Sequence, residues 1–164
     1  MPKKVRAIPK GFRTVTPYLV IRNCAEAVKF YQKAFDAKKR EVMKGPDGKG
    51  VMHAEIEIGN SVLMMCDEMP IMQGWVSPQQ LNGTTVCLSL YVEDADQLYK
   101  KAVKAGCTVT MPLADQFWGD RCGRVRDPYG HEWFIATHIA DFTPKQISKA
   151  AAAFLAGLPA GKSR

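Results

Sequence analysis

The chain has 164 residues, 46% of them hydrophobic and 24% charged, a composition that suits one compact domain or two small fused modules. The net charge of +7 comes from residues 1–13 and 157–164, which hold basic residues and no acidic ones, while the remainder is balanced. This placement favours solvated tails over a specific nucleic-acid surface.

The sequence contains no apolar run for a bilayer span and no signal-peptide pattern, so we expect a cytoplasmic protein without a membrane partner. The five cysteines lack a CxxC spacing, which favours reduced thiols over disulfides or structural zinc.

The first half of the chain predicts the order β-α-β-β-β. Pro17 suggests an edge or a bulge in the first strand, and Asn23 is a suitable N-cap for the helix. Apolar residues recur every three or four positions in that helix and alternate in the strand after it. The expected elements are a strand over 14–21, a helix over 25–35 and strands near 40–44, 51–58 and 61–66.

The second half predicts the same order again. Asp94 is a suitable N-cap, Gly106 ends the helix, and residues 127–130 (DPYG) form a turn. The expected elements are a strand over 84–92, a helix over 95–105 and strands over 108–111, within 116–126 and over 132–137.

Two further segments lie outside these modules. The connector, residues 67–83, contains Trp75 and suggests an ordered loop over an apolar surface. Thr143 and Gln146 form a capping-box pattern that begins a helix ending near 156, which packs either on its own subunit or on a partner. Residues 157–164 are expected to fray. Methionines gather near the connector, where they suit an adaptable ligand cavity, a dimer seam or core filling: Met64, Met65, Met69 and Met72.

The two halves match at a constant offset of 71 residues. Asn23 matches Asp94, and Gly59 matches Gly130, so the same offset holds at a helix start and at a turn. A repeat unit of this size cannot bury its apolar face alone, so the copies are expected to share a core. The groove between them is a natural place for a ligand.

Two segments carry a resemblance to a known family: PYLVIRNCAEAVKFYQKAF (residues 17–35) and DQFWGDRCGRVRDPYGHEWFIATH (residues 115–138). With the repeat, they resemble the glyoxalase/bleomycin-resistance/extradiol-dioxygenase, or vicinal oxygen chelate, superfamily, and the second segment resembles its PhnB-like subgroup. The resemblance implies an α+β fold in which two paired β-α-β-β-β modules form cupped half-barrels around a cavity, here with an added C-terminal helix. It also implies a homodimer and, in catalytic members, one divalent metal on the cavity floor.

The residues at the implied metal positions do not suit a metal. Counting from the helix starts and the turns places Thr16 and Cys87 on the first strands and Leu63 and Phe134 on the last strands. A divalent site needs three or four converging imidazole, carboxylate or thiolate ligands. We therefore expect no metal cofactor, with a divalent metal held by other residues as the alternative.

The candidate pocket residues come from several places in the sequence. His53 and Glu55 share one face of a strand and could act as a general base with its orienting carboxylate, or stay a solvated polar face. Phe117, Trp118 and Arg121 could form a pocket wall or an internal latch. The full predicted set is His53, Glu55, Trp75, Cys87, Phe117, Trp118 and Arg121.

Other notable residues suggest structural roles. By the 71-residue offset, Arg124 and Arg126 match His53 and Glu55, so these opposite charges are expected to pair across the modules. His131 and Glu132 are expected at the surface. Trp133 is expected in the core or the cavity.

These observations predict a protein that binds a small organic molecule without the superfamily metal. One alternative is a metal-dependent glyoxalase-like lyase or dioxygenase that uses His53 and Glu55. A second is a protein that sequesters an antibiotic, although the neutral body lacks the acidic groove that a cationic drug would need. A third is a purely structural dimer module. The sequence does not identify the substrate.

Overall fold

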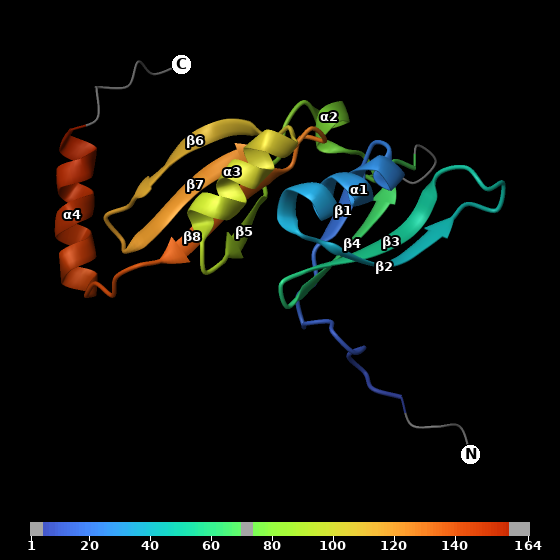
Figure 1. The fold of residues 1–164 in the computed structure, drawn as a ribbon, viewed down its shortest axis with the longest axis horizontal. Coiled ribbons are helices and arrows are strands. Elements are labelled where there is room, and N and C mark those ends of the chain that lie inside the picture. Colours follow the sequence, from blue (N-terminus) through green and yellow to red (C-terminus); the bar gives the residue numbers. More distant parts are fainter. Residues whose placement is uncertain (1–4, 70–73, 158–164) are drawn as a thin grey trace.

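The computed structural model describes residues 5–69 and 74–157, in two modules that lie side by side (Figure 1). The first module contains β1 (Tyr18–Ile21), α1 (Cys24–Phe35), β2 (Lys38–Lys44), β3 (Val51–Ile58) and β4 (Ser61–Asp67). The second contains β5 (Cys87–Tyr91), α3 (Ala95–Ala105), β6 (Thr108–Asp115), β7 (Asp120–Arg126) and β8 (Glu132–His138). The connector carries the short helix α2 (Pro78–Leu81), and α4 (Pro144–Ala156) follows the second module.

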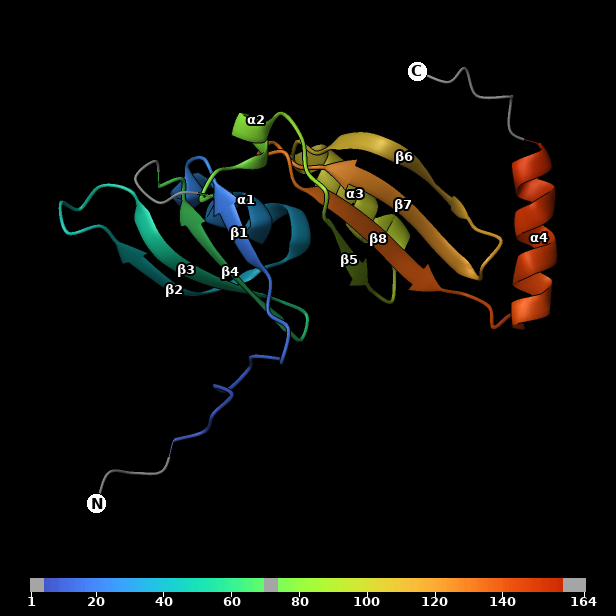
Figure 2. The same ribbon diagram turned by 180° about the vertical axis from the view of Figure 1, so that it is seen from behind.

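Each module forms one four-stranded mixed sheet. The strand orders are β1-β4-β3-β2 and β5-β8-β7-β6, and in each sheet the first strand pairs in parallel with the last. Helices α1 and α3 pack against each other on the same side of the two sheets, and no described helix covers the opposite faces (Figures 1 and 2). The predicted α+β fold of two β-α-β-β-β modules with a C-terminal helix is confirmed.

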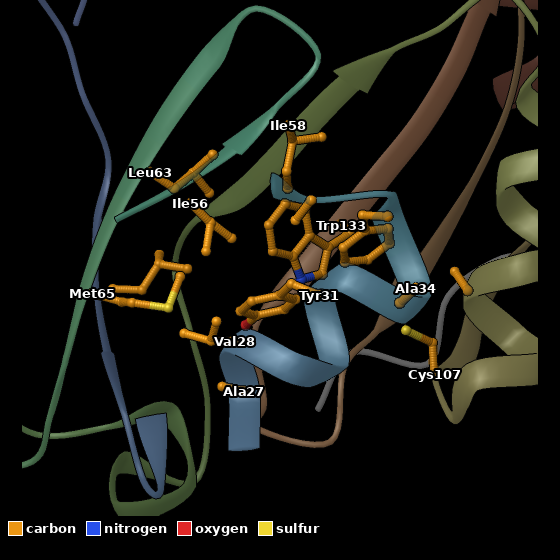
Figure 3. Close-up of a cluster of buried hydrophobic side chains, with 14 of the residues drawn as sticks. Ala27, Val28, Tyr31, Ala34, Ile56, Ile58, Leu63, Met65, Cys107 and Trp133 are labelled. Carbon is orange, nitrogen blue, oxygen red and sulfur yellow. The ribbon is translucent and has the colours of Figure 1, made fainter. Parts of the chain in front are cut away.

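The two modules share one apolar core (Figure 3). Trp133 of the second module is fully buried, as predicted for the core, and its ring lies 5.4 Å from that of Tyr31 and 4.6 Å from that of Phe35, both on α1. Ile56 and Met65 approach from the first sheet. Because aromatic side chains bury large areas, this cluster fixes the two modules against each other.

The helix boundaries follow the predictions, but one cap is different. Asp94 caps α3 as predicted, since its side chain accepts a hydrogen bond from the Gln97 backbone. Asn23 precedes α1 in a left-handed conformation, and its side chain makes no capping hydrogen bond with the described residues. Asp67 at the end of β4 accepts from the Cys24 backbone instead, at 2.6 Å. Asn23 therefore occupies the predicted N-cap position, but a carboxylate distant in sequence, and not the Asn23 side chain, satisfies the first helical donor.

The connector and the C-terminal segment differ in how they attach. Helix α2, which the sequence did not predict, is capped by Ser77, and Ser77 also donates to Glu68 at 2.5 Å. Helix α4 begins at the predicted Thr143–Gln146 capping box, yet none of its described residues is buried. Its Phe154 ring lies 5.5 Å from that of Phe117. No helix among the described residues has the length and apolarity that a membrane crossing requires.

The 71-residue offset holds for the helices and the first strands but not for the last two strands. Tyr18 pairs with Met64, and the equivalent Ser89 pairs with Phe134, so the offset at the last strand is 70. Leu63 lies in the core, whereas Phe134 lies on the other face of its sheet, so the prediction that these two are equivalent was wrong. The slip arises before the last turn, because Glu55 pairs with Met64 and the equivalent Arg124 pairs with Phe134, which makes the offset between β3 and β7 69.

Candidate functional site

Strand alternation places a row of polar side chains on the face of the first sheet that lies opposite α1. We call this surface the first open face; it comprises Tyr18 of β1, His53, Glu55 and Glu57 of β3, and Met64 of β4. Tyr18 and Glu55 both pair with Met64, so β4 holds the other two strands in register. The intervening residues of β3 turn into the core, as period-two alternation requires.

Tyr18, His53 and Glu55 form a continuous hydrogen-bonded row. The Tyr18 hydroxyl lies 3.2 Å from His53 Nδ1, and His53 Nε2 lies 3.4 Å from Glu55 Oε1. Because a carboxylate only accepts, Nε2 carries the hydrogen, and Nδ1 of the neutral ring accepts from the Tyr18 hydroxyl. The His53 and Glu55 side chains are 24% and 14% exposed, so the row is partly shielded but reachable.

Trp75 adds an aromatic wall beside this row. Its ring meets that of Tyr18 edge-on, with centroids 5.1 Å apart. The Trp75 carbonyl accepts from the Met69 backbone at 3.2 Å, which ties the described parts of the connector together. The predicted ordering of Trp75 over other side chains is thus observed; Met72 lies outside the described residues.

Arg40 of β2 lies at the other end of the row. It contacts Glu55 Oε2 through Nε and Glu57 Oε2 through Nη1, each at 3.3 Å. It also donates to the Lys10 carbonyl at 3.1 Å and lies over the Phe12 ring. One guanidinium therefore neutralises one of two carboxylates and holds the N-terminal segment against this edge.

The Tyr18 hydroxyl is held in its protonated form. Burial raises the pKa of Tyr18 to about 12, and the neighbouring Cys66 and Cys24 thiols raise it further. Burial also raises the pKa of Cys24 to about 12. At neutral pH these groups are an uncharged phenol and an uncharged thiol, so the Tyr18 hydroxyl serves as a hydrogen-bond donor.

Two cavities follow the seam between the edge strands β1 and β5. The first, of about 680 Å³, is lined by Tyr18, Val20, Val76, Leu81 and Leu88, among others. The second, of about 670 Å³, reaches Leu90 and Trp133. Apolar walls with a few polar groups are typical of small-molecule sites, and Tyr18 joins the first cavity to the hydrogen-bonded row.

The open face of the second sheet has a different arrangement. Glu132, at 9% exposure, accepts from Arg126 at 2.7 Å and lies 3.7 Å from Arg124. The predicted pairing of these arginines with His53 and Glu55 was therefore wrong, because Glu132, expected at the surface, is buried and already binds them. Cys87 is exposed on this face, away from the Tyr18 row, and burial is the main cause that raises its thiol pKa.

Phe117, Trp118 and Arg121 make contacts within the second module and line none of the described cavities. Trp118 donates through Nε1 to Asp120 at 2.9 Å, and its ring lies edge-on to that of Phe117. Arg121 forms ion pairs with Asp96 and Asp115. Of the predicted pocket set, the structure brings together His53, Glu55 and Trp75 and places the other four residues elsewhere.

Two site residues were missed by the sequence reading. Tyr18 was assigned to a strand without a role, although its position three residues before the buried Ile21 would have placed it on the opposite, polar face. Arg40 lies on a strand whose register shifts between Lys39 and Glu41, and that irregularity has no signal in the sequence.

These features define a protein with two sheet modules and a polar, aromatic-walled site on one of them. A family model, the Glyoxalase/Bleomycin resistance protein/Dioxygenase superfamily, matches residues 13–135, and the chain belongs to this superfamily. An uncharacterized protein of Mycobacterium bovis is 41% identical over 83% of this chain and 90% of its own length. A gene product of Arabidopsis thaliana has a similar structure, with a TM-score of 0.60 and 27% identity over 75% of this chain and 97% of its own. A PhnB protein from Bacillus cereus shares the fold, with a TM-score of 0.58 and 18% identity over 78% of this chain and 100% of its own.

The superfamily implies a divalent metal, and the residues of this chain do not fit one. The ladder places Met64 and Phe134 at equivalent open-face positions of the last strands, and neither side chain is a ligand for a hard or borderline ion. Among residues 5–69 and 74–157, no group of three or more His, Cys, Asp or Glu side chains converges as a metal site would require.

Proposed function

We propose that this chain is a PhnB-like member of the superfamily that binds a small organic molecule on the first open face, beside Trp75 and Tyr18, without the superfamily metal. The observation that carries the proposal is the row Trp75–Tyr18–His53–Glu55, which adjoins an apolar cavity of about 680 Å³. The aromatic pair offers an apolar wall, and the imidazole and carboxylate offer directed polar contacts. Few polar groups in an apolar setting give orientation and specificity to a small ligand.

We also propose that a second copy of the chain covers the open faces. Glu55 and Glu57 lie on the first open face, and Arg124 and Arg126 lie on the corresponding face of the second sheet. Arg124 and Arg126 keep 46% and 57% of their side chains exposed beside Glu132, and opposite charges on two surfaces favour association. A homodimer joined in this way would close the ligand site, and light scattering at low and high salt tests it: a mass of one chain, 18.2 kDa, at both salts would refute it. We further propose a cytoplasmic location, in keeping with five free thiols.

A thermal-shift screen of small aromatic and carboxylic compounds tests the binding proposal. We expect hits whose stabilisation falls strongly in a Trp75→Ala variant and persists in Trp118→Phe, the matched control on the second module. Elemental analysis of the untagged protein accompanies the screen. Stoichiometric divalent metal, or hits that depend on Trp118 and not on Trp75, would contradict the proposal.

A further inference from the structure

The hydrogen bonds of the Tyr18–His53–Glu55 row run in one direction, from the Tyr18 hydroxyl to His53 and from His53 to Glu55. We propose that it is a proton relay: the site takes up a small molecule with an acidic hydroxyl group, such as a phenol or an enol, and holds it as its anion after the proton passes through Tyr18 to His53. This inference rests on the proposed function, because the molecule must bind at the same site.

The direction follows from the hydrogen bonds. Glu55 accepts the His53 Nε2–H, so Nδ1 of the neutral ring is free to take a proton from the Tyr18 hydroxyl, 3.2 Å away. The Tyr18 oxygen keeps lone pairs for a second hydrogen bond. A ligand hydroxyl beside Tyr18 can therefore donate to that oxygen, which completes a chain from the ligand to the imidazole.

The proton balance needs no further reactant. The ligand O–H bond breaks and a new O–H bond forms at Tyr18, while the original Tyr18 O–H bond breaks and an N–H bond forms at His53 Nδ1. The products are a ligand oxyanion, which accepts a hydrogen bond from Tyr18, and an imidazolium beside Glu55. A hydroxyl, an imidazole and a carboxylate act in the same order in serine hydrolases.

The surroundings favour this charge distribution. Among the described residues, Arg40 contacts Glu55 of the row and also Glu57, and His131 lines the cavity beside Tyr18. A single guanidinium against the two carboxylates leaves one net negative charge to stabilise the imidazolium. The Cys66 and Cys24 thiols beneath Tyr18 are uncharged, since burial raises the pKa of each. Because its pKa is raised to about 12, Tyr18 stays protonated, and the negative charge rests on the more acidic ligand.

The cavity sets the remaining properties of the ligand. Most of its lining is apolar, including Val20, Val76, Leu81 and Leu88, while Thr84, Thr85 and His131 add polar groups. The body of the ligand should therefore be mainly apolar or aromatic. The ligand class is therefore a compact apolar molecule with one acidic hydroxyl.

The test uses 4-nitrophenol, whose anion and neutral form differ in visible absorbance. We expect the pKa of the bound probe to fall by at least about one unit below that of the free probe. His53→Gln should remove this shift while the probe still binds, and Glu55→Gln should reduce it. Tyr91→Phe is the matched control, because Tyr91 donates to Asp120 on the second sheet, and it should leave the shift unchanged. Circular dichroism confirms that each variant is folded.

Three outcomes would overturn the relay: a bound probe whose pKa is unchanged or raised, a shift that persists in His53→Gln, or no binding of 4-nitrophenol to the wild type. None of these refutes the proposed function, which fails only when the wider thermal-shift screen yields no ligand dependent on Trp75. Nitrogen NMR gives a readout without ligand: the neutral His53 ring should carry its proton on Nε2, and Tyr18→Phe should move the Nδ1 resonance.

Discussion

Replacing Asp127 by alanine removes a buried carboxylate that joins the two modules. Asp127 is 3% exposed and accepts from the Tyr31 hydroxyl at 2.7 Å, Trp133 Nε1 at 2.8 Å, and the backbones of Tyr129 and His131 at 2.9 and 3.0 Å. Tyr31 belongs to the first module and Trp133 to the second, so this carboxylate satisfies one buried side-chain donor from each module.

The cost follows from the two donors that the variant leaves buried. Tyr31 and Trp133 are both fully buried, and each unsatisfied buried donor costs about 1–3 kcal/mol. With the lost turn bonds, we expect Asp127→Ala to lower the free energy of unfolding by about 4 kcal/mol. For a chain of this size that corresponds to a fall in Tm of roughly 10 °C.

Urea unfolding followed by far-UV circular dichroism measures this loss. Tyr31→Phe is the matched control, because it removes one donor and leaves the carboxylate with three partners; its cost should be about 1.5–3 kcal/mol, the range for a hydrogen bond to a charged group. The double variant should cost clearly less than the sum of the two single changes, because the partners are in contact. A loss below about 1 kcal/mol in Asp127→Ala would refute the reasoning.

Three further predictions concern the second module. A Cβ at Gly119, where φ is +102°, would collide with the Ala140 carbonyl just after β8. Gly119→Ala should therefore lower the Tm by several degrees, and an unchanged Tm would contradict this expectation. Hydrogen bonds to Asp120, and to a smaller extent to Asp141, raise the pKa of His138 above 6.5 in the folded protein. The contribution of protonated His138 to the free energy of unfolding is therefore complete below about pH 6.5 and is lost as the pH rises through the raised pKa of the folded state. His138→Gln should therefore cost more stability near pH 6 than near pH 9 in urea titrations, and equal losses would argue against the contacts. Cys87 is the exposed member of the five thiols, so Ellman's reagent should label one thiol in the folded protein and five in urea; two or more fast thiols would disagree with the fold.

Local signals in the sequence were sufficient for most of the fold. Capping residues such as Asp94 and Thr143 marked helix starts correctly, because a side chain that bonds its own backbone acts within a few residues. Asn23 also marks a helix start, but Asp67, 44 residues away, provides the capping hydrogen bond, and no local pattern encodes such a partner. The offset of 71 residues likewise located both helices but not the register of the last strands.

The candidate site was predictable only in part. His53 and Glu55 were found because strand alternation places them on one face, and Trp75 because a connector containing Trp suggested an ordered loop. Their meeting point, the Tyr18 hydroxyl, depends on the parallel pairing of β1 with β4, which brings together residues 35 positions apart. Arg121 was misplaced because two carboxylates on other elements, Asp96 and Asp115, bind it.

A crystal structure of the protein with the strongest thermal-shift hit tests the central claim most directly. We expect density for the ligand beside the Trp75 and Tyr18 rings, with a polar atom within hydrogen-bond distance of the Tyr18 hydroxyl or of His53. Density on the second sheet, between Arg124 and Cys87, with the Trp75–Tyr18–His53 row left free, would contradict it.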